Sequence, residues 1–251
     1  MLSLLNIILL VYGLILGSFY NVVGLRVPAG KSFVYPGSHC PSCGHKLGAM
    51  ELIPVLSYFI QKGKCRGCGS RISPIYPSIE FLTGVLFATV PLVVGWNYEL
   101  IIALTLISLF IIIFVSDLAY MIIPDKVLLV FAGIFLLERI FIPLTPWWDS
   151  LVGGAIGFVL LLVIALVSKG GMGGGDIKLF AIIGFVVGTK TLLLSFFFST
   201  LLGAVIGLLA MAFGLVKKGK PIPFGPFIAV GTLIAYYYGD SLISMYLNLY
   251  F

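Results

Sequence analysis

A run of glycines near the middle of the chain ends on a carboxylate. Five of the six residues at 170–175 are glycine and Asp176 follows them, between strongly apolar segments at 151–167 and 179–187. Glycine adopts backbone angles and permits close approaches that other residues do not. An acid at the edge of a hydrocarbon segment is costly, so it indicates a functional group. Because so many glycines make a poor helix start and a poor linker, the run predicts a special role for Asp176.

A second carboxylate, Asp117, ends another apolar segment at 100–116. Two carboxyl groups a few ångströms apart share one proton, so the charged member can activate water while the protonated member polarises a carbonyl. Such a pair hydrolyses peptides without a metal. Asp125 is an alternative to Asp117 as the first acid of this pair. However, Pro124 favours a helix start there, which makes Asp125 a helix-terminal acid. The residues alone also allow Asp117 to be a lone interfacial acid and Asp176 to be a helix N-cap.

The composition places these acids in a membrane protein. Hydrophobic residues make up 61% of the 251 residues and charged residues only 10%, and the mean hydropathy is +1.19. A soluble domain carries about 25% charged residues. The net charge of +6 does not indicate a nucleic-acid partner, because the charges fall between apolar segments, where they encode membrane topology. We therefore expect an all-α polytopic membrane protein whose partner is the lipid bilayer.

About 20 apolar residues cross the hydrocarbon core as a helix, and eight segments approach this length. The first has no cleavage site and is expected to be retained as a helix; the sixth is short. They are 2–23, 77–95, 100–116, 127–143, 151–168, 179–189, 192–216 and 226–247. We expect about eight transmembrane helices and three parts: helix 1 at 1–26, a cytosolic loop domain at 27–76, and a seven-helix membrane core at 77–251.

The basic residues fix an orientation for these segments. With the N-terminus outside, only Arg139 and Lys190 of the 15 basic residues fall outside, as the positive-inside rule expects. Asp117 and Asp176 then lie at one depth on the cytosolic face. The basic residues placed in cytosolic loops are Arg26, Lys31, Lys46, Lys62, Lys64, Arg66, Arg71, Lys126, Lys169, Lys178, Lys217, Lys218 and Lys220.

All four cysteines of the chain lie in the loop domain, as two C-x-x-C-G knuckles. Cys40, Cys43, Cys65 and Cys68 could close a tetrahedral Zn²⁺ site of the structural type. The alternative is a pair of disulfides, which a reducing cytosol disfavours. His39 and His45 could replace a cysteine, but the cysteine set is already complete.

The glycine run resembles a known motif, because residues 173–176 fit the G-x-G-D pattern of intramembrane aspartyl proteases. More specifically, the chain resembles bacterial type IV prepilin peptidases over nearly its whole length. The matching motifs are Gly17–Val23 with Arg26 and Pro28, the paired cysteines, Tyr76–Glu80, Asp117 with Ile123–Asp125, Gly171–Lys178 and Pro221–Pro226.

The resemblance implies an activity and its residues. It implies that Asp117 and Asp176 are catalytic, and that Gly173, Gly175 and Lys178 support the catalytic loop. It also implies that the basic leader of type IV prepilins and pilin-like proteins of competence or secretion is cut at the cytosolic face of a bacterial cell membrane. The new N-terminus would then be methylated with S-adenosylmethionine. No soluble methyltransferase fold fits in the loop domain, so this second activity rests on resemblance alone and no residues are assigned to the methyl donor.

Three other interpretations stay open at the level of sequence. The chain could be a peptidase without methyltransferase activity. It could be an ion-coupled transporter in which Asp117 and Asp176 bind a proton or cation, but it lacks two halves with matching interrupted helices. It could be a membrane scaffold that docks a partner through the cysteine module, which is the loop domain at 27–76 with its four cysteines. A scaffold, however, does not need acids beside apolar segments. The peptidase interpretation accounts for most of these features.

Overall fold

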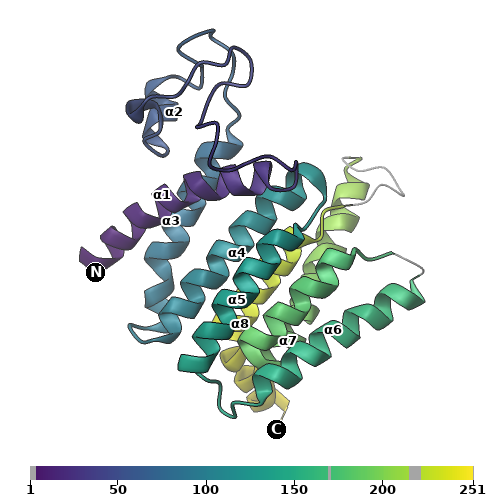
Figure 1. Ribbon diagram of the computed structural model, residues 1–251. Helices are drawn as coiled ribbons and strands as arrows, with labels where there is room; N and C mark the ends of the chain where they lie inside the picture. The colour runs from purple at the N-terminus through teal and green to yellow at the C-terminus, as the bar shows by residue number, and fades with distance from the viewer. Residues whose placement is uncertain (1–3, 169–170, 215–221, 251) are drawn as a thin grey trace. The chain divides into compact units, whose positions relative to one another are not determined.

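The computed structural model describes residues 4–168, 171–214 and 222–250 (Figure 1). Over these ranges it is helical, with no β-strand beyond two isolated bridges, which confirms the all-α class. The predictions for Lys169, Gly170, Lys217, Lys218, Lys220 and Pro221 lie outside the described residues. The elements are α1 Leu4–Arg26, the 3₁₀ turn η1 Ala49–Glu51, α2 Leu56–Ile60, α3 Ile75–Val94, α4 Glu99–Tyr120, α5 Asp125–Phe141, α6 Asp149–Val167, α7 Gly174–Ala212 and α8 Gly225–Tyr250.

Five of these helices are long and apolar enough to cross a bilayer, namely α1, α3, α4, α6 and α7. The chain is therefore a membrane protein, as its composition predicts, while the number of about eight crossings stays a prediction. The short helix α2 was not expected from the sequence. The chain divides into two compact units, Met1–Val115 and Ser116–Phe251, which are described separately below.

In the first unit, α1 packs closely on α3 through a small residue. A Cβ atom on Gly17 would lie only 2.9 Å from the Cα atom of Glu80, so the helices approach at a distance that only glycine permits. The hydroxyl of Tyr20 on α1 donates to the hydroxyl of Ser108 on α4 at 2.7 Å, in a buried position. Gly17 is therefore a small residue that the packing of α1 on α3 requires.

In the second unit, α7 folds back on itself at Gly188, which has a φ of 78°. The rings of Phe180 and Phe196 lie 6.1 Å apart, whereas 16 residues of straight helix would separate them by about 24 Å. Asp149 accepts hydrogen bonds from the backbone amide and the hydroxyl of Thr189, at 3.2 and 2.6 Å, and so holds the turn. The predicted segments 179–189 and 192–216 are therefore the two arms of one element.

Several predicted helix boundaries were wrong by a few residues. Helix α4 continues to Tyr120 rather than ending at 116, and α7 begins at Gly174 rather than at 179. The start of α7 inside the glycine run contradicts the expectation of a poor helix start. Its reason is local, because the Asp176 carboxylate accepts a hydrogen bond from the Gly173 amide at 3.2 Å and so satisfies one of the free N–H groups of the helix end.

Candidate active site and metal centre

Asp117 lies in the last turn of α4 and is 6% exposed. One of its carboxylate oxygens accepts a hydrogen bond from the backbone amide of Gly225, at 2.7 Å. Gly225 is the first residue of α8, and free N–H groups at a helix start stabilise a nearby carboxylate. The chain turns sharply after α4, where the amide of Met121 donates to the Asp117 carbonyl at 2.8 Å. The carboxylate of Asp117 is therefore held by the start of α8, and its backbone by the turn that follows α4.

Asp176 is the third residue of α7 and is partly buried. The N-cap of this helix is Gly173, so the alternative that made Asp176 the N-cap is wrong. Its carboxylate instead reaches back to the Gly173 amide. Because the first turn of a helix favours negative charge, the fold places both acids at helix starts, Asp117 beside α8 and Asp176 within α7.

Two contacts bring the segment that follows Asp117 against the start of α7. A Cβ atom on Gly175 would lie 2.7 Å from the Cβ of Ile123, so the backbones meet closely there. The Lys178 ammonium group lies 2.7 Å from a carboxylate oxygen of Asp125. Within this frame the carboxyl groups of Asp117 and Asp176 are near enough to interact electrostatically. Such a pair can share a proton and perform general acid–base chemistry.

Asp125 occupies a different environment from the two other acids. It begins α5, as predicted, and its side chain is 68% exposed in its ion pair with Lys178. A surface ion pair contributes only about 0–1 kcal/mol to stability. The predicted support residues Gly173, Gly175 and Lys178 all lie in the first turns of α7 or next to them, and each contacts one of these acids or the segment between them.

Gly225 is a site residue that the sequence did not reveal, because its contribution is a backbone N–H. The available signal was a Pro-rich motif directly before a helix, at 221–226. We expect Gly225→Pro to lower kcat/KM about ten- to a hundredfold, since proline fits a helix start but lacks the donor and a hydrogen bond to a charged group contributes about 1.5–3 kcal/mol. Gly225→Ala keeps the N–H and should retain activity. Equal losses in the two variants would show that the hydrogen bond is not what matters.

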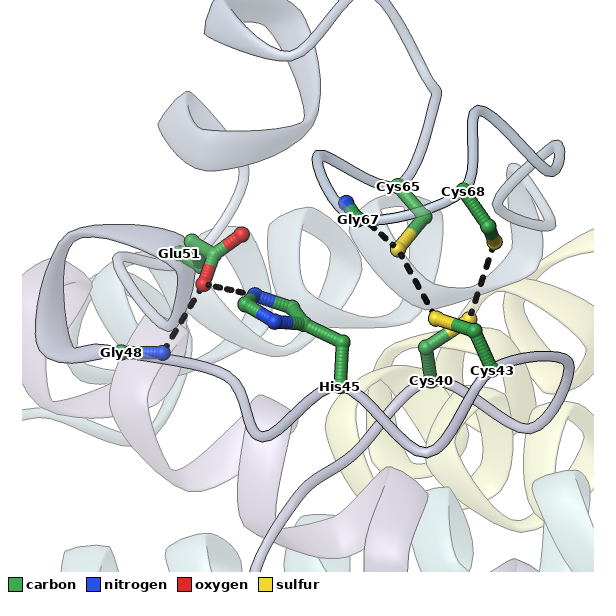
Figure 2. A network of polar contacts seen from close by, with 8 residues as sticks. All are labelled: Cys40, Cys43, His45, Gly48, Glu51, Cys65, Gly67 and Cys68. Carbon is green, nitrogen blue, oxygen red and sulfur yellow. Dashed lines mark hydrogen bonds and ion pairs between the residues drawn. The ribbon is translucent and has the colours of Figure 1, made fainter.

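The four cysteines gather in the first unit, with their sulfur atoms all within 4.8 Å of one another (Figure 2). The sulfurs of Cys40 and Cys68, and those of Cys43 and Cys65, are 3.9 Å apart. Four ligands about 2.3 Å from a tetrahedral Zn²⁺ would be about 3.8 Å apart. The two knuckles have the same backbone pattern, with the glycine after each pair donating to the first cysteine's carbonyl, at 2.9 and 2.8 Å. The cluster therefore fits a zinc ion.

The hydrogen bonds around the cluster favour metal binding. The Ser70 hydroxyl, with nearby backbone amides, lowers the pKa of the Cys40 thiol to about 5, and it also lowers the pKa of Cys68. The His45 amide lowers the pKa of Cys43, but the Cys68 sulfur and burial outweigh it and raise that pKa to about 12. Hydrogen bonds thus favour the thiolate form, in which cysteine binds metal, at two of the four cysteines.

His39 and His45 have partners outside the cysteine cluster. The His45 ring lies 3.1 Å from a carboxylate oxygen of Glu51, which also accepts the Gly48 amide at 2.9 Å (Figure 2). The Gly48 amide, and then His45, lower the pKa of Glu51. Nothing in the sequence singled out Glu51, yet it closes the loop that follows the first knuckle.

Comparison with known proteins places the chain in a family. The model of the Bacterial Peptidase A24 N-terminal domain matches residues 11–94, and that of the Type IV leader peptidase family matches residues 104–208. A prepilin leader peptidase/N-methyltransferase of Bacillus subtilis (strain 168) is 48% identical over 96% of this chain and 98% of its own. Proteins with the same name from Aeromonas salmonicida (strain A449) and Pseudomonas aeruginosa are 32% and 31% identical, over 94% of this chain and 92% and 91% of theirs.

The chain therefore belongs to the type IV leader peptidase family and is an enzyme. The resemblance stated from the motifs is confirmed. No solved structure matches the fold.

Proposed function

We propose that the chain is an intramembrane aspartyl endopeptidase that removes the basic leader of type IV prepilins and pilin-like proteins and then N-methylates the product. The observation that carries the peptidase part is the contact of the segment after Asp117 with the start of α7, at Ile123 and Gly175. This contact supports a pairing of the two acids, each of which accepts a hydrogen bond at a helix start. The methylation part is supported by the name that the relatives share.

The proposed mechanism uses the two carboxyl groups and one water molecule. The ionised carboxyl group takes a proton from water as the water oxygen bonds to the scissile carbonyl carbon, and the other carboxyl group gives its proton to the carbonyl oxygen. When the tetrahedral intermediate collapses, the C–N bond breaks and the amine leaves with a proton from the first carboxyl group, while the second carboxyl group takes back a proton from a hydroxyl of the intermediate as the C=O bond re-forms. The amide of Gly225 would hold Asp117 in position throughout.

The basic residues support an orientation for this chemistry. With the N-terminus outside, α4 ends and α7 begins at the cytosolic face, which then carries 13 of the 15 basic residues. A prepilin would lie with its apolar segment in the membrane and its leader in the cytosol. The scissile bond would then reach Asp117 and Asp176. The division into helix 1, the loop domain at 27–76 and the core at 77–251 remains part of this proposal.

The cysteine cluster is proposed to hold a structural Zn²⁺ through Cys40, Cys43, Cys65 and Cys68. When bound, the ion would tie together a loop domain that has few buried apolar residues of its own. The residues do not offer an equally clear place for S-adenosylmethionine. The cavity of about 570 Å³ in this domain is lined by Lys62, Lys64 and Arg71, and three cations do not suit a cationic sulfonium. No step of the proposed methylation is assigned to residues of this chain.

One experiment tests both activities. Purified protein is incubated with a prepilin and S-adenosylmethionine, and the new N-terminus is read by mass spectrometry. We expect a cut and methylated product. A cut product without the methyl group would support the peptidase-only alternative, and an uncut chain would contradict the proposal.

We expect the purified protein to contain about one zinc per chain, and replacement of Cys40 and Cys43 by serine to remove it. The new N-terminus would be released beside this cytosolic loop domain, so methylation would depend on the domain more than cleavage does. Metal loss unfolds a small module, while the membrane helices keep their own packing. Methylation should therefore fall more than cleavage. Zinc is measured by elemental analysis and both products by mass spectrometry. His39→Ala is the matched control, since among the described residues its ring pairs with the Gly37 carbonyl, at 2.9 Å, and not with the sulfurs.

Two results would contradict this assignment. Absence of metal together with no free thiol would mean disulfides, and the orientation of the loop would then be wrong. Equal loss of cleavage and methylation in a well-inserted variant would show that the module also shapes the peptidase site.

A further inference from the structure

Helix α2 exposes three large apolar side chains in a single short turn. Leu56, Phe59 and Ile60 are 60%, 69% and 61% exposed, although the helix is only five residues long. Packed side chains would cover such residues in a water-soluble domain, and contiguous exposed apolar surface indicates an interaction site. No described residue buries these three.

The position of α2 relative to a membrane-crossing helix is fixed by a hydrogen bond. The amide of Val55, directly before α2, donates to the carboxylate of Glu80 at 2.7 Å. Glu80 is five residues into α3, or about 7.5 Å along that helix at 1.5 Å per residue. Figure 1 shows α2 near the end at which α3 begins. Val55 therefore lies beside the second turn of α3, and α2 follows it near the end at which this helix, long and apolar enough to cross a membrane, begins.

A basic cavity adjoins the same helix. Its lining includes Tyr58 of α2 together with Lys62, Lys64 and Arg71, and it has a volume of about 570 Å³ with no acidic residue among its walls. Lys64 and Arg71 face each other in an antiparallel bridge. Like charges in directly opposed positions are destabilising, and no hydrogen bond or ion pair joins these three cationic side chains to another described residue. The cavity is therefore suited to an anion.

The cavity also borders the membrane helix. Ser73 and Pro74 form part of its wall, and α3 begins at the next residue. An anion bound there would lie at the level of the lipid headgroups, and the phosphate of an anionic phospholipid is the anion that occurs at that level. Long basic side chains reach headgroups while their stems stay against apolar surface.

We propose that α2 is an interfacial membrane anchor of the cysteine module: Leu56, Phe59 and Ile60 lie among the lipid chains, and Lys62, Lys64 and Arg71 bind phosphates of anionic phospholipids. This combination of an apolar helix face with basic residues at its edge is the one that holds peripheral helices at anionic membranes. The anchor would fix the module at the membrane face independently of peptidase chemistry.

The test places a fluorescent reporter on α2 of the full-length protein. Trp96, Trp147 and Trp148 are changed to phenylalanine, and Phe59→Trp supplies the only indole. The protein is reconstituted in phosphatidylcholine bilayers that carry brominated acyl chains, with or without phosphatidylglycerol. We expect the Phe59→Trp reporter to be quenched at least about twofold more than a matched Met50→Trp reporter, because an interfacial helix buries its apolar face among the chains. Met50 is similarly exposed, at 64%, in the same module.

The role of the cations is tested with two charge-matched variants of the protein that carries the Phe59→Trp reporter. One adds Lys62→Gln, Lys64→Gln and Arg71→Gln; the other adds Lys31→Gln, Lys46→Gln and Arg66→Gln, which removes the same charge from the module away from the cavity. Phosphatidylglycerol should increase quenching in the parent and in the second variant, but not in the first. Quenching no stronger for the reporter on α2 than for the Met50→Trp reporter would overturn the anchor, and identical behaviour of the two charge variants would overturn the phosphate site.

Discussion

Replacement of either Asp117 or Asp176 by asparagine is expected to abolish leader cleavage while the protein still folds and inserts. Asparagine has the same shape and can accept the same backbone hydrogen bonds, from Gly225 at position 117 and from Gly173 at position 176. It cannot take up or release the proton that the reaction moves. Loss of a general acid or base costs about 10²- to 10⁴-fold, and both roles depend on the pair. Cleavage is measured by mass spectrometry at protein levels matched to the parent.

Asp125→Asn is the matched control for this experiment. Asp125 is exposed and its ion pair with Lys178 lies at the surface, where such a pair contributes about 0–1 kcal/mol. This variant should keep substantial activity. Near-normal cleavage by Asp117→Asn or Asp176→Asn would exclude the catalytic pair, and complete loss in Asp125→Asn would show that Asp125 is the first catalytic acid. A thermal unfolding curve for each variant separates loss of chemistry from loss of fold.

The fold was predictable where hydropathy alone decides the outcome. An apolar run long enough to span becomes a helix because its backbone must satisfy its own hydrogen bonds, and the segments at α1, α3, α4 and α6 follow this rule. Boundaries were less predictable, because local polar contacts set them. Helix α7 begins within the glycines since the Asp176 carboxylate pairs with the Gly173 amide, and glycine's low helix propensity indicated the opposite.

The candidate site was predictable where side chains carry the chemistry. The acids Asp117 and Asp176 and the four cysteines stand out because charge beside hydrocarbon is costly and because paired thiols suit zinc. Gly225 did not stand out, since its contribution is an amide that every non-proline residue has. Glu51 was missed for a related reason: its partners, His45 and the Gly48 amide, are specified by the turn between them and not by residue type.

The two glycines of the G-x-G-D motif, Gly173 and Gly175, differ from Gly174 between them in the neighbours that an added Cβ atom would meet. A Cβ on Gly175 would meet the Cβ of Ile123 at 2.7 Å and its carbonyl oxygen at 3.4 Å, and a Cβ on Gly173 would lie 3.0 Å from an Asp176 carboxylate oxygen. A Cβ on Gly174 would meet nothing within 4 Å. We therefore expect packing at the site, and not a general need for flexibility, to require glycine at positions 173 and 175 and to leave position 174 free.

Gly175→Ala is accordingly expected to lower kcat/KM about a hundredfold, whereas Gly174→Ala should stay close to the parent. The added methyl group cannot be accommodated by a flexible side-chain end, because it meets the Cβ of Ile123. The segment 121–124 must then move, and with it the end of α4 that carries Asp117. A displacement of about 1 Å at a reacting group can cost about 10²-fold in rate. Alanine at 174 meets open space and is the better helix former.

Cleavage kinetics of the Gly175→Ala and Gly174→Ala variants, with unfolding curves, measure this difference. Equal losses would mean that the motif requires flexible backbone at both positions, and the close approach of Ile123 to Gly175 would not be the reason for the glycine.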